Sequence, residues 1–281
     1  MNIIDGKKLA EERRLINAEE IAQLAQKGIK PSLAVVLVGD NDASKVYVRN
    51  KIRACEKWGI RSIEHRLPAS TTEEELIALI KNMNEDSEVN GILVQLPLPS
   101  HICEETILNL INPEKDVDGF SDVNAGKVMR GTNVLTACTP KGIVQLIKST
   151  GTEIKGKSCV IIGRSNIVGK PIAMLMLNES ATVTVCHSKT QNLAEITSKA
   201  DILISAIGVS KFVKADMVKE GAVVIDVGIN RDENNKLCGD VDFENVSPKC
   251  SFITPVPGGV GPMTISCLME NTVIAAKMQN R

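Results

Sequence analysis

Aromatic residues are scarce in this sequence, with one Trp, one Tyr and four Phe among 281 residues. Proteins that bind single-stranded nucleic acid stack the bases on aromatic rings, so this shortage disfavours that class. An excess of one charge is also missing, because 33 Lys and Arg offset 34 Asp and Glu, mixed along the chain. A nucleic-acid footprint or an acidic tail needs a block of like charge. We therefore expect no nucleic-acid partner.

Long apolar runs are absent as well, and no stretch approaches the roughly 20 residues of a membrane span. The first six residues, MNIIDG, lack the basic flank and apolar core of a secretory leader. None of the eight cysteines forms a Cys-x-x-Cys pair and most lie in apolar runs, which predicts buried free thiols and no metal site. Cys138 is the exception, since it lies at a predicted loop. These features indicate a cytoplasmic protein without a membrane anchor.

What the chain does have is a strand, glycine loop and helix at residues 158–177. The apolar run SCVII stops at Gly163, and a predicted helix opens with Pro171. Free N–H groups at such a helix start attract phosphate. The spacing does not fit a P-loop, because five residues separate Gly163 from Gly169, and Gly-x-Gly-x-x-Gly fails at Ser165. The alternative is a strand–helix junction that binds no ligand.

The following strand indicates which nucleotide this loop would hold. An NAD site usually ends its second strand with an acidic residue on the ribose. Here residues 182–186 are followed by His187-Ser188-Lys189-Thr190, without a carboxylate. With Arg164 nearby, Ser188 and Lys189 are suited to a ribose 2′-phosphate, which predicts NADP. These cations are alternatively solvated surface residues.

The pattern of strands and helices predicts two α/β domains. Residues 33–38 form a continuous apolar run, typical of a strand buried on both faces, and further strands are predicted at 61–66 and 91–95. A second series at 158–162, 182–186, 202–205 and 222–226 alternates with helices, as in a Rossmann-like dinucleotide-binding domain. We expect one domain over residues 1–137, its segment 124–136 connecting the halves, and a second over 138–263. The last helix, within 264–281, is expected to pack back on the first domain.

Three polar residues of the first domain stand out. Lys51 shares a predicted inward helix stripe with Tyr47, the stripe being positions 44, 47, 51, 54 and 58. Partial burial disfavours the ammonium form and suits proton transfer, although a lone lysine more often extends to solvent. Gln95 ends a buried strand, at the sheet edge where ligands bind. Asp118 lies in a loop rich in carboxylates, which is alternatively an ordinary turn; its spacing fits no EF-hand.

Two further segments of the second domain have an unusual composition. Residues 254–264 contain three prolines and three glycines within eight positions, which predicts a fixed backbone with exposed amides facing a ligand. Residues 227–230 leave the fourth strand where a nicotinamide ribose would rest.

Five ordered motifs together resemble the bifunctional methylenetetrahydrofolate dehydrogenase/cyclohydrolase family. They are residues 47–51, 91–99, 115–119, 163–171 and 255–264, and the resemblance covers nearly the whole chain. It implies oxidation of 5,10-methylenetetrahydrofolate with NADP⁺ and hydrolysis of the methenyl product to 10-formyltetrahydrofolate. These are steps of one-carbon metabolism that serve purine biosynthesis. It also implies a cleft between the domains that serves both steps, and a homodimer formed through the cofactor domain.

The same resemblance implies roles for individual residues. Lys51 would be the central catalytic residue, with Gln95 as its hydrogen-bond partner, Tyr47 against the folate and Asp118 on the pterin. The implied substrate-binding set comprises Tyr47, Lys51, Val94, Gln95, Leu96, Asp118, Pro255, Gly258, Gly259, Pro262 and Thr264. The implied cofactor-binding set comprises Thr139, Gly163, Arg164, Ser165, Ile167, Val168, His187, Ser188 and Ile229.

Two other functions compete with this interpretation. A dehydrogenase for a different small substrate would keep the glycine loop but would not need Tyr47, Lys51, Gln95 and Asp118 together. A non-enzymatic regulator that binds NADP would need none of the four.

Overall fold

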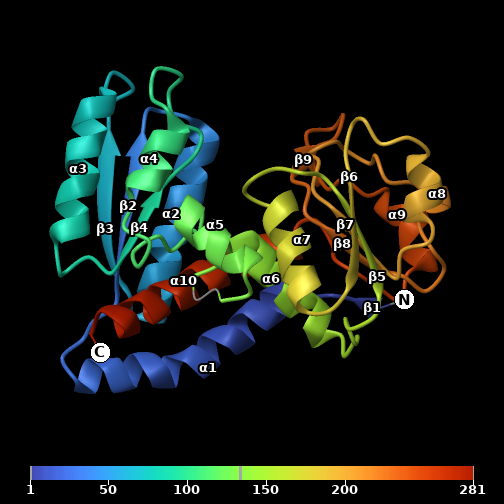
Figure 1. Cartoon of the computed structure of the whole chain (residues 1–281), viewed down its shortest axis with the longest axis horizontal. Coiled ribbons are helices and arrows are strands. Elements are labelled where there is room, and N and C mark those ends of the chain that lie inside the picture. Colours follow the sequence, from blue (N-terminus) through green and yellow to red (C-terminus); the bar gives the residue numbers. More distant parts are fainter. Residues whose placement is uncertain (1, 133–134, 281) are drawn as a thin grey trace. The chain divides into compact units, whose positions relative to one another are not determined.

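The computed structural model describes residues 2–132 and 135–280, and its strands form two parallel sheets and one hairpin (Figure 1). The chain divides into two units. The six-stranded unit comprises Met1–Glu12 and Thr139–Thr264, and the three-stranded unit comprises Arg13–Cys138 and Ile265–Arg281. Of the three points where the chain passes between these units, the first lies inside helix α1 (Gly6–Gln26) and the last inside α10 (Val260–Gln279). The prediction of two α/β domains, one of them Rossmann-like, is confirmed.

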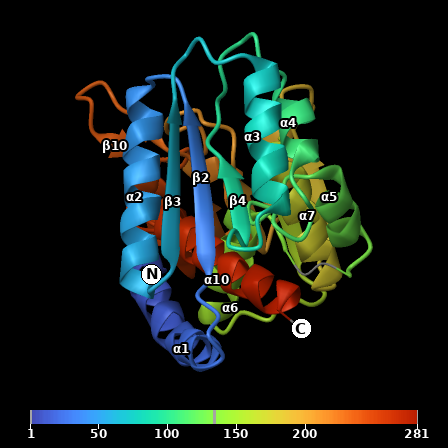
Figure 2. The ribbon, with the colours of Figure 1, turned by 90° about the vertical axis from the view of Figure 1, so that its left-hand side faces the viewer.

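The three-stranded unit is built on β2 (Ser32–Val38), which lies between β3 (Arg61–Leu67) and β4 (Gly91–Val94) and pairs in parallel with both. Every residue of β2 is buried, as its apolar run predicts. Alternate side chains enter two cores: Leu33, Val35 and Leu37 pack with α2 (Asp42–Trp58) and α10, whereas Ala34, Val36 and Val38 pack with α3 (Glu73–Glu85) and α4 (Glu104–Leu110). Figure 2 shows α2 and α3 beside this sheet.

Helix α3 begins at a capping box formed by Thr72 and Glu75. The Thr72 hydroxyl accepts the Glu75 N–H, and the Glu75 carboxylate accepts the Thr72 N–H. The segment predicted to connect the halves, residues 124–136, overlaps a helix, α5 (Asp122–Met129), which Ser121 caps. One expectation for this unit was wrong. The buried side of α2 is Ser44, Val48, Cys55 and Trp58, so Tyr47, which was predicted on the inward stripe, lies outside the buried side and is 42% exposed.

The six-stranded unit has the strand order β1-β11-β8-β7-β5-β6, with all neighbours parallel. Its strands are β1 (Asn2–Ile3), β11 (Phe252–Ile253), β8 (Val223–Asp226), β7 (Ile202–Ser205), β5 (Ser158–Ile162) and β6 (Thr182–Cys186). From β5 the chain passes first to β6 on one side and then to β7 on the other. Ligands in open α/β sheets bind at such a switch point, beyond the carboxyl ends of the strands.

Apolar layers cover both faces of this sheet. Ile161, Ile204 and Ile225 pack with α6 (Cys138–Ser149) and α7 (Gly169–Asn178). The opposite face packs against the short helices α8 (Leu193–Thr197), η1 (Ala215–Met217) and α9 (Phe243–Val246), the last of which is followed by η2 (Ser247–Lys249). The strands β9 (Asn230–Arg231) and β10 (Leu237–Cys238) pair in antiparallel as a separate hairpin.

The first residues of the chain join the six-stranded unit rather than the segment that follows them. Asn2 and Ile3 pair with Phe252 and Ile253 at the sheet edge, and Gly6 packs on the carbonyl of Gly259 with no room for a Cβ. Residues 1–12 were predicted to belong to the first domain, because a two-residue strand has no periodicity to reveal its partner. Among helices of residues 2–132 and 135–280, none has the length and apolar character needed to span a bilayer.

Candidate active site

The Lys51 ammonium group and the Gln95 amide meet at the carboxyl edge of the three-stranded sheet. Lys51, on α2, donates from Nζ to Gln95 Oε1 at 2.9 Å, and Gln95 directly follows β4. The amide is held in this orientation because its Nε2 donates to the Leu96 carbonyl at 2.7 Å. Lys51 and Gln95 are both half-buried. Lys51 is therefore not a fully solvated surface lysine, and the pair is not enclosed in the core either.

Asp118 supplies a carboxyl group near this pair. Burial raises its pKa, the positive charge of Lys51 opposes that rise, and the neighbouring carboxylate of Asp116 adds to it. A hydrogen bond from the Cys138 side chain also favours the ionised form. Cys138 is buried and its Sγ lies 3.2 Å from the Val117 carbonyl, so the one cysteine that the sequence placed at a loop does border the site.

Asp116, rather than Asp118, fixes the fold of this loop. Its carboxylate accepts the backbone N–H groups of Gly119, Phe120 and Ser121, at 2.9, 3.2 and 2.9 Å, and the side-chain amide of Asn124 at 3.0 Å. Asp116 is 1% exposed, and its carboxylate oxygens accept these four hydrogen bonds from the loop, none of which involves the Asp118 side chain. The sequence alone does not distinguish Asp116 from Asp118, because two aspartates two residues apart in one loop look equivalent.

The glycine loop between β5 and α7 has the close packing of a phosphate-binding turn. Gly163 adopts φ +126, and a Cβ there would collide with the Ala206 carbonyl, while a Cβ on Gly169 would collide with the Gly163 carbonyl. The Ser165 hydroxyl accepts the N–H groups of Val168 and Gly169, each at 3.2 Å. In the part of the chain that is described, the N–H groups of residues 164–167 have no protein acceptor. They are therefore available to an anion at the start of α7.

Polar residues gather after β6, next to this loop in the sheet order. The His187 N–H donates to Thr190 Oγ1 at 2.8 Å, and the Lys189 N–H lies 3.1 Å from His187 Nδ1, which closes a tight turn. Ser188 and Lys189 are exposed at its tip, and Arg164 is exposed in the glycine loop. No carboxylate occupies the end of β6, as the sequence predicts.

The other predicted site residues are distributed over both units. Val94 is buried in the core and Leu96 is half-buried, both in the three-stranded unit. In the six-stranded unit, the hydroxyls of Thr139 and Thr264 lie 2.9 Å apart, which joins one predicted cofactor residue to one predicted substrate residue. Ile167 and Ile229 are exposed apolar side chains, at 41% and 52%. The remaining predicted substrate-binding residues lie around a tight turn in which Gly258 has φ +108. They are Pro255, Gly258, Gly259 and Pro262.

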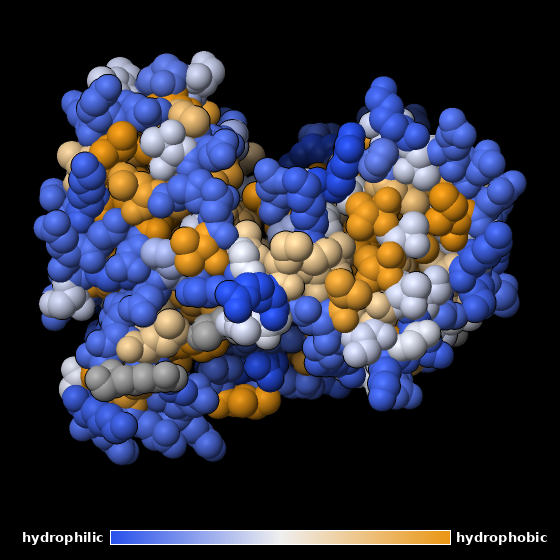
Figure 3. Space-filling view, in the orientation of Figure 1, coloured by the Kyte–Doolittle hydropathy of each residue, from blue (hydrophilic) through white to orange (hydrophobic). Residues whose placement is uncertain are grey.

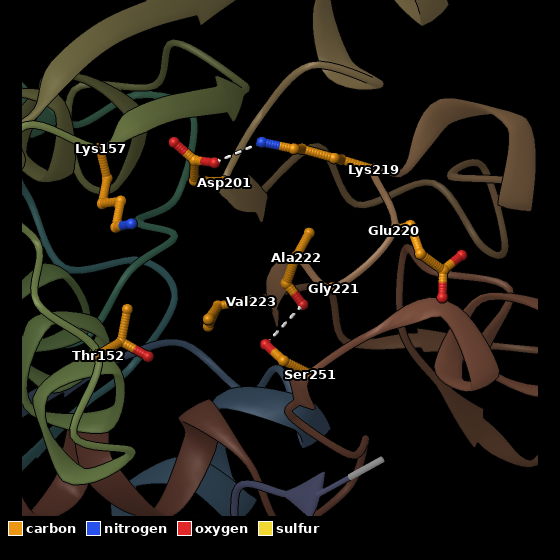
Figure 4. Close-up of a pocket in the computed structure, with 9 residues that line it drawn as sticks. All are labelled: Thr152, Lys157, Asp201, Lys219, Glu220, Gly221, Ala222, Val223 and Ser251. Atoms are coloured by element: carbon orange, nitrogen blue, oxygen red, sulfur yellow. Dashed lines mark hydrogen bonds and ion pairs between the residues drawn. The ribbon is translucent and has the colours of Figure 1, made fainter.

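A cavity of about 170 Å³ lies at the opposite end of the six-stranded sheet (Figure 4). Its lining comes from residues that precede strands, including Lys157 before β5 and Asp201 before β7. Lys219 Nζ pairs with Asp201 Oδ1 at 2.7 Å, and Ser251 Oγ donates to the Ala222 carbonyl at 3.3 Å. Because nucleotides bind beyond the carboxyl ends of parallel strands, this cavity is not the cofactor site.

Comparison with known proteins identifies the family. A family model described as the tetrahydrofolate dehydrogenase/cyclohydrolase catalytic domain matches residues 4–118, and its NAD(P)-binding domain matches residues 137–280. The chain belongs to the tetrahydrofolate dehydrogenase/cyclohydrolase family. The resemblance carried by the five sequence motifs is thereby confirmed.

Individual members of the tetrahydrofolate dehydrogenase/cyclohydrolase family align over essentially the full chain. The bifunctional protein FolD of Campylobacter hominis is 60% identical, over 99% of this chain and 98% of its own. The crystal structure of the bifunctional FolD of Campylobacter jejuni superposes with a TM-score of 0.97 at 52% identity, covering 99% of both chains. The FolD of Trypanosoma brucei, solved with NADP cofactor and an inhibitor, has a TM-score of 0.94 at 40% identity, over 99% of this chain and 98% of its own.

Proposed function

We propose that Lys51, supported by Gln95, Tyr47 and Asp118, is the centre of a bifunctional folate enzyme. The protein oxidises 5,10-methylenetetrahydrofolate with NADP⁺ and hydrolyses the methenyl product to 10-formyltetrahydrofolate. The observation that carries the residue assignment is the 2.9 Å hydrogen bond from Lys51 Nζ to Gln95 Oε1, with the carboxyl of Asp118 close enough to sense the lysine charge.

A single assay tests this function. Methylenetetrahydrofolate and NADP⁺ are mixed with the protein, and the absorbance of NADPH and of the methenyl product is followed. NADPH formation and a subsequent enzyme-dependent decay of the methenyl absorbance are expected. NADPH without hydrolysis would leave only a dehydrogenase, and binding of NADP⁺ without turnover would favour a regulator.

Lys51 serves the hydrolysis as a proton carrier. As the amine it takes a proton from the water that attacks the methenyl carbon, and it returns that proton to the ring nitrogen when the carbon–nitrogen bond breaks. The remaining hydroxyl proton is released to solvent as the formyl C=O forms. Gln95 keeps the amine in place, because its carbonyl oxygen accepts one N–H and its own amide is anchored on Leu96.

Asp118 and Tyr47 orient the folate for both steps. The carboxylate of Asp118 accepts two hydrogen bonds, from the pterin amino group and the adjacent ring N–H. Tyr47 offers a largely exposed aromatic surface one helical turn from Lys51, on which the folate packs. Val94 and Leu96 flank Gln95 along the chain, and the segment containing Pro255, Gly258, Gly259, Pro262 and Thr264 completes the proposed substrate set. A substrate held in one pose gains rate because its reacting carbon needs no further orientation.

NADP⁺ is the hydride acceptor, and the six-stranded unit has the residues to hold it. The unpartnered N–H groups of residues 164–167 receive the pyrophosphate, and Ser165, Ile167 and Val168 lie in the same loop. Arg164, His187 and Ser188 hold the ribose 2′-phosphate. Thr139 and Ile229 contact the nicotinamide half.

Replacing Arg164 with Ala should weaken NADP⁺ binding selectively. Loss of one charge-assisted contact costs about 1.5–3 kcal/mol, so the KM for NADP⁺ is expected to rise roughly 10- to 100-fold with little change in kcat. Kinetics with NAD⁺, which has no 2′-phosphate, should be unaffected. Arg231→Ala, at an exposed arginine of the β9–β10 hairpin, is the matched control. An unchanged preference for NADP⁺ would return Arg164 to a solvated surface cation.

We also propose a homodimer formed through the six-stranded unit. Strand β6 is at one edge of the sheet, and an apolar surface extends over β6 and α7 (Figure 3). Leu177 is 53% and Val185 37% exposed there. An edge strand beside apolar surface is a typical pairing site. Sedimentation measurements at micromolar concentration should show a dimer, and a monomer would refute this proposal.

A reducing cytoplasm is the proposed location of the protein, because it suits the eight cysteines, all of which are free.

A further inference from the structure

Two buried carboxylates lie side by side at the carboxyl edge of the six-stranded sheet. Asp226 is the last residue of β8 and is 3% exposed, and Asp240, just after β10, is fully buried. Neither forms an ion pair with any residue in 2–132 or 135–280. Buried charges without a cation are costly and persist where hydrogen bonds replace the water they have lost.

The carboxylate of Asp240 accepts hydrogen bonds from the end of β7 and from the loop that follows it. Its Oδ2 accepts from the Ser205 hydroxyl at 3.1 Å and from the N–H groups of Ile207 and Gly208 at 2.8 and 3.3 Å. Its Oδ1 accepts the Val209 N–H and the side-chain amide of Asn230, each at 3.0 Å. One carboxylate therefore joins residues 205–209 to the segment that leaves β8.

Asp226 in turn holds Asp240 and its neighbours. Its Oδ1 accepts the N–H groups of Gly228 and Asp240, at 3.0 and 2.8 Å, and its Oδ2 accepts that of Val241 at 2.9 Å. Burial raises the pKa of Asp226 to about 7, the three N–H donors oppose this, and the charge of Asp240 adds to it. A Cβ on Gly228 would strike the Asp240 carboxylate, and one on Gly239 the Asp226 carboxylate, so both glycines are needed for the approach.

The segments held in this way border the glycine loop. The Ala206 carbonyl is the atom against which Gly163 packs without a Cβ. Ile229, between Gly228 and Asn230, is the exposed apolar residue assigned above to the nicotinamide half. The loops after β5, β7 and β8 thus share one edge, and two of them depend on Asp240.

We propose that Asp240, fixed by Asp226, is a positioning residue for the dehydrogenase reaction. By accepting five hydrogen bonds it sets residues 206–209 and 227–230 in the conformation that receives the nicotinamide half of NADP⁺. The inference rests on the proposed location of the cofactor. The cyclohydrolase step consumes no NADP⁺, so it does not depend on this residue.

The five hydrogen bonds at this position require an acceptor on both oxygens of the Asp240 side chain, which a carboxylate provides. All five partners are donors, three at Oδ2 and two at Oδ1, and an aspartate offers acceptors on both oxygens. An asparagine has almost the same shape, but its NH₂ group would face two or three donors. The loop must then move away from that side.

The test is Asp240→Asn, with Asp242→Asn as the matched control. Asp242 is two residues away and partners the exposed Lys214 and Asn245. For Asp240→Asn we expect at least a tenfold rise in the KM for NADP⁺ and a comparable fall in dehydrogenase kcat/KM. Methenyl hydrolysis without cofactor should stay within twofold of the wild type. The control should retain both activities.

Three results would overturn the proposal: dehydrogenase kinetics like those of the wild type, an equal loss of both activities, or a loss of dehydrogenase kcat with an unchanged KM for NADP⁺. If Asp240→Asn does not fold, Ser205→Ala removes one of the five donors and leaves no buried donor unpaired. It should raise the KM for NADP⁺ severalfold with hydrolysis unchanged, and wild-type kinetics for this variant would also overturn the proposal. A wild-type protein that lacks dehydrogenase activity would instead refute the proposed function.

Discussion

Lys51→Met is expected to lower methenyl hydrolysis by about 10²- to 10⁴-fold, the usual contribution of a positioned acid–base group. The methionine side chain is similar in length and fills the same half-buried space beside Gln95. It carries no proton to give or take, so water attacks without a base and the ring nitrogen leaves without an acid. The fold and the affinity for NADP⁺ should be retained, because Lys51 is in the three-stranded unit and its one described hydrogen bond is to Gln95.

The measurement is the rate of methenyl absorbance decay at saturating substrate, corrected for the uncatalysed reaction. Lys57→Met, an exposed lysine in the last turn of the same helix, serves as the control and should leave the rate unchanged. Circular dichroism and NADP⁺ titration verify the fold. Hydrolysis at the wild-type rate in Lys51→Met would remove Lys51 from the acid–base role.

Asp118→Ala is expected to raise the KM for methylenetetrahydrofolate by about 100-fold. The carboxylate is proposed to accept two hydrogen bonds from the pterin, and each hydrogen bond to a charged group contributes about 1.5–3 kcal/mol. The loop itself should keep its conformation, since Asp116 rather than Asp118 accepts its backbone N–H groups. Glu114→Ala, at an exposed carboxylate of the same loop, is the control.

The pH dependence gives a second readout of the same residue. Burial raises the pKa of Asp118 above the ordinary 3.8, with the charge of Lys51 opposing that rise. Only the ionised carboxylate accepts both pterin hydrogen bonds, so folate affinity is present above this raised pKa and is lost as the pH falls through it. Asp118→Ala should lack this dependence. A KM that is unchanged in the variant would make Asp118 an ordinary turn residue.

Much of the scaffold could be predicted from local patterns. The apolar runs of β2 and β5, the Thr72–Glu75 capping box and the Gly163 loop each express a rule that acts within a few residues. Helix α5 was missed because its eight residues lie in a polar segment with little periodicity. The buried side of α2 was misjudged because both possible stripes contain apolar residues, and only the position of the sheet selects Val48 and Cys55.

The sequence by itself determined the family, the two α/β halves, the strand–glycine loop–helix unit and the absence of an acidic residue after β6. Each of these depends on residues that are neighbours in the chain. Tertiary structure alone decided that Asn2 and Ile3 belong to the six-stranded sheet, that Asp116 rather than Asp118 accepts the backbone N–H groups of the loop, and that Asp226 and Asp240 join segments that are separate in the chain. These depend on contacts between residues far apart in the chain. A carboxylate acquires its role from the donors that folding brings to it, and no local pattern records which donors those are.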